Sequence, residues 1–339
     1  MPAVSVVLPF HNPGEYFPGA IESILAQTFD DFELLLLDDA SNDGSKEVAE
    51  EIAKRDSRVR IIRANVNLGL SRQLNRGVEE STGDFVARMD ADDIALPSRF
   101  ERQLSVFRAK PDVGICGCLV DEISQTGEET GFRWDLPAEH DQIASLQFIR
   151  CGFSHPSVMF RKSVLDDYSL RYREDFEVAQ DYELWIRLLQ FSKGYNIQDA
   201  LLKYRRFPEQ LSQKSSPRKL QEVNEIRGQI LKLIGVENID QGQIMHKRFC
   251  EDNWQRDIDW FQQLVEWLNK VYRTNLITKA MPPKAFGQLL ANRLYMHCHM
   301  ATGRTFNGAQ IFRAADFSSD VTISTVQTAK TYIKSLVAR

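Results

Sequence analysis

Three aspartates, Asp90, Asp92 and Asp93, crowd into four consecutive residues of the chain. Like charges at such short range repel one another, so a positive partner is expected to neutralise them. Hard divalent cations prefer oxygen ligands, and a diphosphate supplies further oxygens to the same ion. The run therefore predicts a Mn²⁺ or Mg²⁺ ion shared between one or two of these aspartates and a diphosphate. The alternative is a capped helix start, because acidic residues favour a helix N-terminus and Pro97 follows closely.

A second acidic pair, Asp38 and Asp39, directly follows the unbroken apolar run 32–37. A carboxylate in this place can accept hydrogen bonds from a nucleobase imide or from ribose hydroxyls, as acids do in dinucleotide-binding folds. The alternative role is the N-terminal cap of the next helix, but Asp43 and Ser45 can supply that cap. The chain has neither a GxGxxG nor a GxxxxGK[ST] loop, so phosphate must be held by a metal and by side chains.

The elements that position these acids alternate between short apolar runs and amphipathic stretches. Such alternation predicts an α/β fold with a mostly parallel sheet covered by helices on both faces. Ligands bind outside the carboxyl ends of the strands in these sheets, and residues 10–12, 38–39 and 90–93 fall there. The predicted strands are 4–8 (ended by Pro9), 32–37, 59–62, 84–89, 113–119, 154–160 and 201–204, and the predicted helices cover 20–27, 48–53, 71–78, 98–109 and 182–189.

Length and charge point to two regions of different character. The 339 residues are enough for one large domain with an appendage or for two domains. Residues 1–202 carry 35 acidic and 21 basic residues, whereas residues 203–339 carry 12 and 21. A boundary is expected near residue 213, followed by helices at 217–235, 254–272 and 285–300. The overall charge of −5 argues against a nucleic-acid binder.

Composition predicts a cytoplasmic protein. No apolar run is long enough for a membrane-spanning helix, and the first residues lack the basic region and apolar segment of a secretory signal. Five cysteines, an odd number without a CxxC pair, argue against a disulfide framework.

Several motifs, taken in order, resemble those of the family 2 glycosyltransferases, which have the GT-A fold. The resemblance covers residues 1–213 and implies an inverting, metal-dependent transfer from a nucleotide-activated sugar, most often a UDP-sugar. It predicts a nucleotide-sugar half at 1–119 and an acceptor-side half at 120–213, with a helical extension of unknown role at 214–339. The matching segments are 4–12 (VSVVLPFHN), 24–29 (ILAQTF), 37–45 (LDDASNDGS), 67–71 (NLGLS) and 90–93 (DADD).

The resemblance also implies which residues bind the donor. Asp39 is expected to contact the base, with Asp38 beside it. Asp90 and Asp92 are expected to hold the metal, the diphosphate and the ribose, and Asp93 to lie near the donor sugar. The other residues expected against the nucleotide are Pro9, Phe10, His11 and Arg72.

The catalytic base of the family is an aspartate that opens a helix, usually as Glu-Asp-x-x-Leu-Trp. Residues 180–185 (QDYELW) fit this motif, with Gln180 in place of the glutamate. The resemblance therefore assigns the base to Asp181 and places Trp185 on the acceptor side. Considered alone, Asp181 could be a helix N-cap, but the Leu-Trp spacing that follows favours the base.

Two further positions depart from the family pattern or stay open. The family often has Tyr-Arg-x-His after this helix, but Phe207 stands in place of the histidine. Arg205 or Arg206 is then expected to neutralise the diphosphate. His155 lies in the acceptor-side segment and either touches the acceptor or has a structural role.

The C-terminal helices and the function each leave alternatives. Trp260, Leu264 and Trp267 share one helical face, which can pack against the catalytic domain or a second copy, or contact anionic lipid at the inner face of the membrane. The expected acceptor is a glycan or lipid-linked glycan. One alternative function is a nucleotidyltransferase, which would require a glycine-rich basic loop after the first strand. Another is a sugar-nucleotide-binding scaffold that has lost catalysis.

Overall fold

The computed structural model describes residues 1–207, 210, 216–251, 257–301 and 308–318. These residues belong to two compact units, the first made of 1–143 and 151–222, and the second of 144–150 and 223–339. The first unit extends past residue 213 to Glu222, because it includes the first turns of helix α8 (Pro217–Ile234). None of the described helices is long and apolar enough to cross a membrane.

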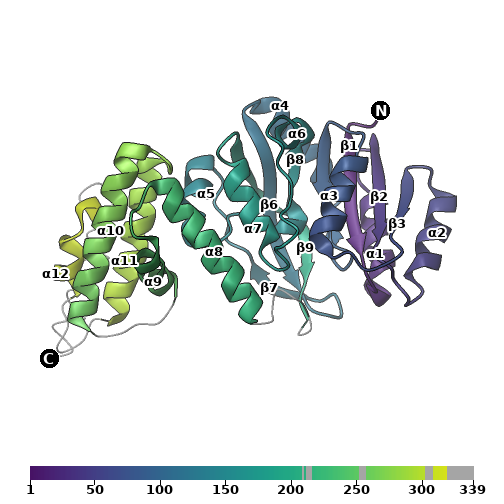
Figure 1. Cartoon of the computed structure of the whole chain (residues 1–339). Coiled ribbons are helices and arrows are strands. Elements are labelled where there is room, and N and C mark those ends of the chain that lie inside the picture. Colours follow the sequence, from purple (N-terminus) through teal and green to yellow (C-terminus); the bar gives the residue numbers. More distant parts are fainter. Residues whose placement is uncertain (208–209, 211–215, 252–256, 302–307, 319–339) are drawn as a thin grey trace. The chain divides into compact units, whose positions relative to one another are not determined.

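The first unit is built on a nine-stranded mixed sheet (Figure 1). The strand order is β3-β2-β1-β4-β8-β6-β9-β5, and β7 pairs with β6. The pairs β1–β2, β1–β4, β2–β3 and β6–β9 are parallel, whereas β8, β5 and β7 join antiparallel. The strands are β1 Val4–Phe10, β2 Phe32–Asp38, β3 Val59–Arg63, β4 Phe85–Arg88, β5 Ile94–Ala95, β6 Val113–Ile123, β7 Glu129–Arg133, β8 Met159–Arg161 and β9 Lys193–Arg205.

Helices cover both faces of this sheet, as the sequence predicted. Alternate residues of a strand point to opposite faces, so Leu34 and Leu36 join one core and Leu35 and Leu37 the other. The first core includes residues of α1, α2 and α4, and the second includes residues of α3, α6 and α7. The helices are α1 Phe17–Leu25, α2 Ser45–Arg55, α3 Leu70–Glu80, α4 Arg99–Ala109, α5 His140–Leu146, α6 Lys162–Asp167 and α7 Gln180–Leu188.

Strand β1 continues through Pro9, although the sequence predicted that Pro9 would end it. The carbonyl of Val7 accepts a hydrogen bond from Met89 N on the β4 side, and Pro9, two residues on, turns to the same side. Strand β4 pairs only with residues 4–7, so the missing amide proton of Pro9 costs no ladder hydrogen bond.

The second half of the sheet differs more from the prediction. The expected strand 154–160 contains a 3₁₀ turn, His155–Ser157, before the short β8, because Pro156 suits the first turn of a helix and donates no hydrogen bond. The expected strand 201–204 is the end of the longer β9. Strand β7 and helix α5 were not predicted, since residues 120–150 are polar and lack a clear period.

The second unit is helical. It contains α9 (Ile239–Cys250), α10 (Ile258–Thr278), α11 (Pro283–Ala301) and α12 (Gly308–Arg313), besides the rest of α8. Trp260 and Leu264 are buried inside this unit, and the ring of Trp267 stacks with that of Phe148. The aromatic face of α10 therefore packs mainly within its own unit, and contact of the C-terminal helices with a membrane stays a prediction.

Candidate functional site

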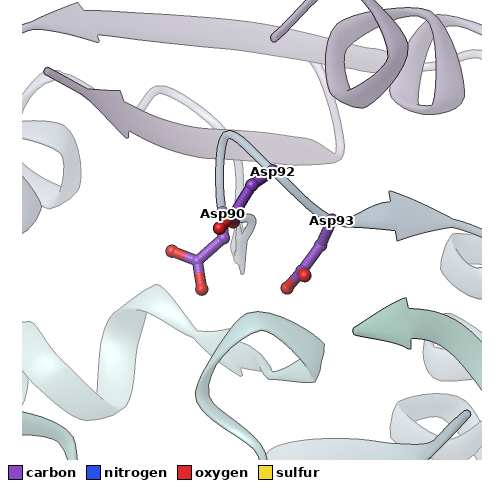
Figure 2. Close-up of side chains that lie close together, drawn as sticks. All are labelled: Asp90, Asp92 and Asp93. Atoms are coloured by element: carbon purple, nitrogen blue, oxygen red, sulfur yellow. The ribbon is translucent and has the colours of Figure 1, made fainter. Parts of the chain in front are cut away.

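The aspartates Asp90, Asp92 and Asp93 lie on the loop that joins β4 to β5, and their side chains gather in one region (Figure 2). One carboxylate oxygen from each residue lies within 4.8 Å of the others. Asp90 and Asp92 are half-buried, and Asp93 is buried. The structure thus brings together the three acids that the sequence singled out.

Burial and mutual repulsion raise the pKa values of Asp92 and Asp93. Burial, together with the charge of Asp90, raises the pKa of Asp92 to about 6. Burial and the neighbouring carboxylates raise the pKa of Asp93 well above its usual value. Asp93 Oδ1 accepts a hydrogen bond from Arg205 N at 2.9 Å, whereas its buried Oδ2 has no partner among the described residues. Clustered oxygen donors with excess negative charge fit a hard divalent cation, and Asp90 and Asp92 could hold it.

Arg88 is a buried positive charge beside this loop that the sequence analysis did not single out. Arg88 is the last residue of β4, is 3% exposed and forms an ion pair with Asp90. Its Nε and Nη1 have no hydrogen-bond partner in the described part of the chain. The available signal was a basic residue at the end of an apolar run, two positions before the first aspartate.

Asp181 is the second residue of α7 and lies within electrostatic reach of the same loop. The N-cap of α7 is Ala179, so the alternative role of Asp181 as N-cap is wrong. Burial raises the pKa of Asp181 to about 6, while the Arg88 charge lowers it and the Asp90 charge raises it. A carboxylate with this pKa is a suitable proton acceptor near neutral pH.

Asp38 and Asp39 are both buried at the end of β2. The carboxylate of Asp39, 4% exposed, accepts hydrogen bonds from Leu68 N (2.8 Å), Gly69 N (2.9 Å) and Gln73 Nε2 (2.6 Å). Gly69 has φ +87°, a conformation that favours glycine, and this turn aims the two amides at Asp39. Asp39 therefore orders the loop before α3.

Asp38 uses its carboxylate differently. Its Oδ1 accepts a hydrogen bond from Ser41 N at 2.8 Å, and its Oδ2 has no partner among the described residues. Asp43 Oδ1 accepts a hydrogen bond from Ser45 N at the start of α2. The N-cap of α2 is Gly44 and no side-chain cap hydrogen bond forms there, so neither Asp43 nor Ser45 is the cap that the sequence predicted.

The residues at the end of β1 differ in exposure. Pro9 is buried, and Phe10 packs against Phe17 in the core with ring centroids 4.4 Å apart. His11 is exposed, and its Nδ1 donates to the Asp39 carbonyl oxygen at 2.7 Å. His11 is thus the member of this group that reaches the surface beside the acids.

The three arginines expected at the nucleotide are engaged with other groups. Arg72 pairs with Glu174 at 2.8 Å on the surface, and Arg206 pairs with Glu122 at 2.9 Å. Arg205 donates from Nε to the Asp92 carbonyl oxygen at 2.9 Å and lies over the Tyr16 ring. The side chain of Arg205 therefore holds the backbone of the acidic loop.

His155 and Trp185 lie together in an aromatic cluster. Nε2 of His155 lies 3.1 Å from the Tyr172 hydroxyl, and burial, followed by the Arg88 charge, holds the pKa of His155 well below its usual value. Trp185 is 0% exposed and packs against the rings of Phe153, His155 and Tyr172. Trp185 therefore supports His155 from the core and, as placed, presents no surface to an acceptor.

An α/β sheet with an acidic loop at the end of its fourth strand is the arrangement of GT-A glycosyltransferases, and a solved structure shares the fold. Staphylococcus aureus TarS 1–349 in complex with UDP-GlcNAc matches with a TM-score of 0.58 at 14% sequence identity, covering 94% of this chain and 90% of that chain.

Relatives at higher sequence identity define the family. A model of glycosyl transferase family 2 matches residues 5–169. The amylovoran biosynthesis glycosyltransferase AmsE of Erwinia amylovora is 34% identical over 206 residues, covering 59% of this chain and 75% of that protein. The O-antigen biosynthesis glycosyltransferase WbnJ of Escherichia coli is 32% identical over 209 residues, covering 60% and 79%. The chain belongs to glycosyl transferase family 2.

A third relative shows how much of each protein the sequence match covers. An uncharacterized glycosyltransferase of Haemophilus influenzae is 30% identical over 211 residues, and the match covers 60% of this chain and 65% of that protein. The similarity thus spans slightly less than two thirds of that relative.

Proposed function

We propose that this protein is an inverting glycosyltransferase that moves a sugar from a nucleotide donor to an acceptor hydroxyl in polysaccharide biosynthesis. The observation that carries this proposal is the electrostatic proximity of Asp181, whose pKa is about 6, to the acidic loop at the end of β4. AmsE and WbnJ are named for amylovoran and O-antigen biosynthesis, which supports a polysaccharide product. TarS has been solved with UDP-GlcNAc, so a UDP-sugar is the first donor to test.

The donor side of the proposal uses the ends of β1, β2 and β4. Asp90 and Asp92 would hold Mn²⁺ or Mg²⁺, and such an ion neutralises the charge of a leaving diphosphate. Asp38 Oδ2, which has no hydrogen-bond partner among the described residues, would accept from a base or ribose, and the exposed His11 lies against the backbone of Asp39. Arg205 holds the acidic loop by donating a hydrogen bond to the Asp92 carbonyl oxygen, and Asp93 is the buried residue of that loop.

The acceptor side of the proposal centres on Asp181. Its carboxylate takes the proton of the acceptor hydroxyl while that oxygen attacks the anomeric carbon, and the bond from this carbon to the diphosphate breaks. Attack from the face opposite the leaving group inverts the anomeric configuration. His155, neutral through burial, can hydrogen bond to a sugar hydroxyl without adding charge.

The organisation of the chain is part of the same proposal. The nucleotide-sugar half is 1–119, and the acceptor-side half, 120–213, contains His155 and Asp181. A glycan or lipid-linked glycan acceptor would bring a cytoplasmic protein to the inner face of the membrane. There the net charge of +9 on residues 203–339 favours contact with anionic lipid.

A donor panel tests the proposal. Purified protein is incubated with UDP- and GDP-sugars, with and without Mn²⁺, and release of the nucleoside diphosphate is measured with and without acceptor glycans. Metal-dependent release that rises with one acceptor supports the transferase. If no sugar nucleotide is turned over although one binds tightly, the proposal fails in favour of the scaffold.

One observation keeps the scaffold as the second candidate. Phe207, which replaces the histidine of the family motif, stacks on Tyr16 with ring centroids 5.8 Å apart. A phenyl ring offers no ligand atom, so this site supplies one metal ligand fewer than the family pattern.

A further inference from the structure

The segment that leads into α7 is held by a carboxylate from another helix. Glu222 lies on α8, and its two carboxylate oxygens accept hydrogen bonds from Glu177 N (2.8 Å), Val178 N (2.9 Å) and Ala179 N (2.8 Å). Glu222 is 2% exposed, and its Oε1 also pairs with Arg218 Nε at 2.9 Å. One buried carboxylate thus binds three consecutive backbone amides.

Glu222 satisfies backbone amides at the start of α7 from outside the helix. The N-cap residue is Ala179, and no side-chain cap hydrogen bond forms there. The first amides of a helix lack partners within the helix, and a nearby negative charge stabilises that end. Asp181 lies two residues after the last amide that Glu222 binds, so the carboxylate fixes the backbone from which Asp181 projects.

Helix α3 fixes the earlier part of the same segment. Ser71 Oγ donates to the Phe176 carbonyl oxygen at 2.7 Å. Asn75 Nδ2 donates to the Tyr172 carbonyl oxygen, and Asn75 Oδ1 accepts from Tyr172 N, both at 2.8 Å. Residues 172–176 are therefore tied to α3 and residues 177–179 to α8, so the stretch that leads into Asp181 is held along its length.

We propose that Glu222 is a positioning residue that holds Asp181 in the orientation needed to accept the acceptor's proton. This inference rests on the proposed function, because it assumes that Asp181 is the base. Glu222 lies beyond residues 5–169, which the family model matches, and on the helix where the second unit begins. Glu222 itself is the last residue of the first unit, so it would act within the unit that contains Asp181.

The isosteric variant Glu222→Gln tests the proposal. A glutamine has the same volume, but it replaces one carboxylate oxygen with an NH₂ group. This group cannot accept a hydrogen bond, so at least one of the buried backbone N–H groups loses its partner. Because small misplacements of a catalytic group cost much of the rate, we expect kcat to fall about tenfold to a hundredfold. The KM for the donor should stay within about twofold of the wild-type value, since the proposed donor-binding residues lie at the ends of β1, β2 and β4 and not on α7 or α8.

The matched control is Glu225→Gln, which makes the same chemical change at an exposed position of the same helix. It should keep the wild-type kcat, and circular dichroism of both variants checks that they fold. An Asp181→Asn background adds a second check: if Glu222 acts through Asp181, Glu222→Gln should reduce the residual rate little further. A wild-type kcat in folded Glu222→Gln, or an equal loss in both backgrounds, would overturn the proposal.

Hydrogen exchange separates this inference from the proposed function. In Glu222→Gln, the amides of Glu177, Val178 and Ala179 should exchange at least about tenfold faster than in wild type, because local opening becomes easier. This readout needs no enzymatic activity. Faster exchange in a protein that transfers no sugar would refute the proposed function but retain the cap, whereas unchanged exchange would refute the cap.

Discussion

Arg88 and Asp90 form an ion pair at the end of β4, where the guanidinium is almost fully buried and the carboxylate stays partly open. Burial raises the pKa values of Asp92, Asp93 and Asp181, and the positive charge of Arg88 opposes part of that rise. The buried charge of Arg88 therefore offsets part of the repulsion among carboxylates from both sides of the proposed site. Breaking such a pair leaves buried charge without compensation.

Replacing Arg88 should destabilise the fold. We expect Arg88→Met to lower the free energy of unfolding at pH 7.5 by about 3 to 5 kcal/mol, measured by urea denaturation. The control is Arg102→Met, which removes an exposed pair with Asp199 and should cost less than about 1 kcal/mol. Equal losses in both variants would show that Arg88 does not carry the charge balance of the site.

Replacing Asp181 should remove catalysis and retain the donor. We expect Asp181→Asn to reduce kcat by about 10²- to 10⁴-fold, because the asparagine amide cannot take the acceptor's proton. Donor affinity, measured by calorimetry with Mn²⁺, should change less than about twofold, since the donor loops lie on other strands. Asp167→Asn, at an exposed position of α6, serves as control. A wild-type rate in Asp181→Asn would refute the assignment of the base.

The rate of transfer should depend on the protonation of Asp181. With a pKa raised to about 6, its carboxylate is protonated below pH 6 and cannot act as a base. We expect kcat to be flat from pH 7 to 8 and to fall about tenfold for each unit below pH 6. The measurement is made at saturating metal, because Asp92 also has a pKa of about 6. A constant rate down to pH 5 would argue against a carboxylate base.

The same pKa makes a prediction about stability. The ordinary pKa is 3.8, so between about pH 4 and 6 the folded protein binds more protons at Asp181 than the unfolded chain does. Its contribution to the free energy of unfolding therefore decreases as the pH rises through this window, by at most about 3 kcal/mol. Asparagine does not titrate, so Asp181→Asn has no such pH-dependent contribution. The free energy of unfolding of Asp181→Asn minus that of wild type should therefore increase from pH 4 to 6.5 in metal-free buffer. A constant difference would show that the pKa is unshifted.

Metal binding should stabilise the protein through the acidic loop. We expect Mn²⁺ at about 100 times its Kd to add about 2.7 kcal/mol to the free energy of unfolding, since it binds the folded state. The shift in Tm should vanish with EDTA and in Asp92→Asn. Asp84→Asn, an exposed change just before β4, should keep the full shift. An equal shift in Asp92→Asn would place the metal elsewhere.

The sequence by itself determined the first half of the fold and the position of the acids along it. Apolar runs of strand length, separated by amphipathic stretches, correctly predicted β1 to β4 with α1 to α3, because burial on both faces imposes these local periods. Since parallel strands end at one edge, the order of elements was also enough to bring Asp38, Asp39 and Asp90 to the same side of the sheet.

Only the tertiary structure decided how these side chains are used. Strand β8 inserts antiparallel between β4 and β6, a pairing that no local period encodes. Whether Asp39 faces a ligand or three protein donors, and whether Arg205 binds a diphosphate or a loop carbonyl, depends on chain segments that meet only after folding. Glu222 caps amides 43 to 45 residues away. Hydrogen bonds and ion pairs act over a few ångströms, so the partners of a buried charge are fixed by packing and not by spacing along the chain.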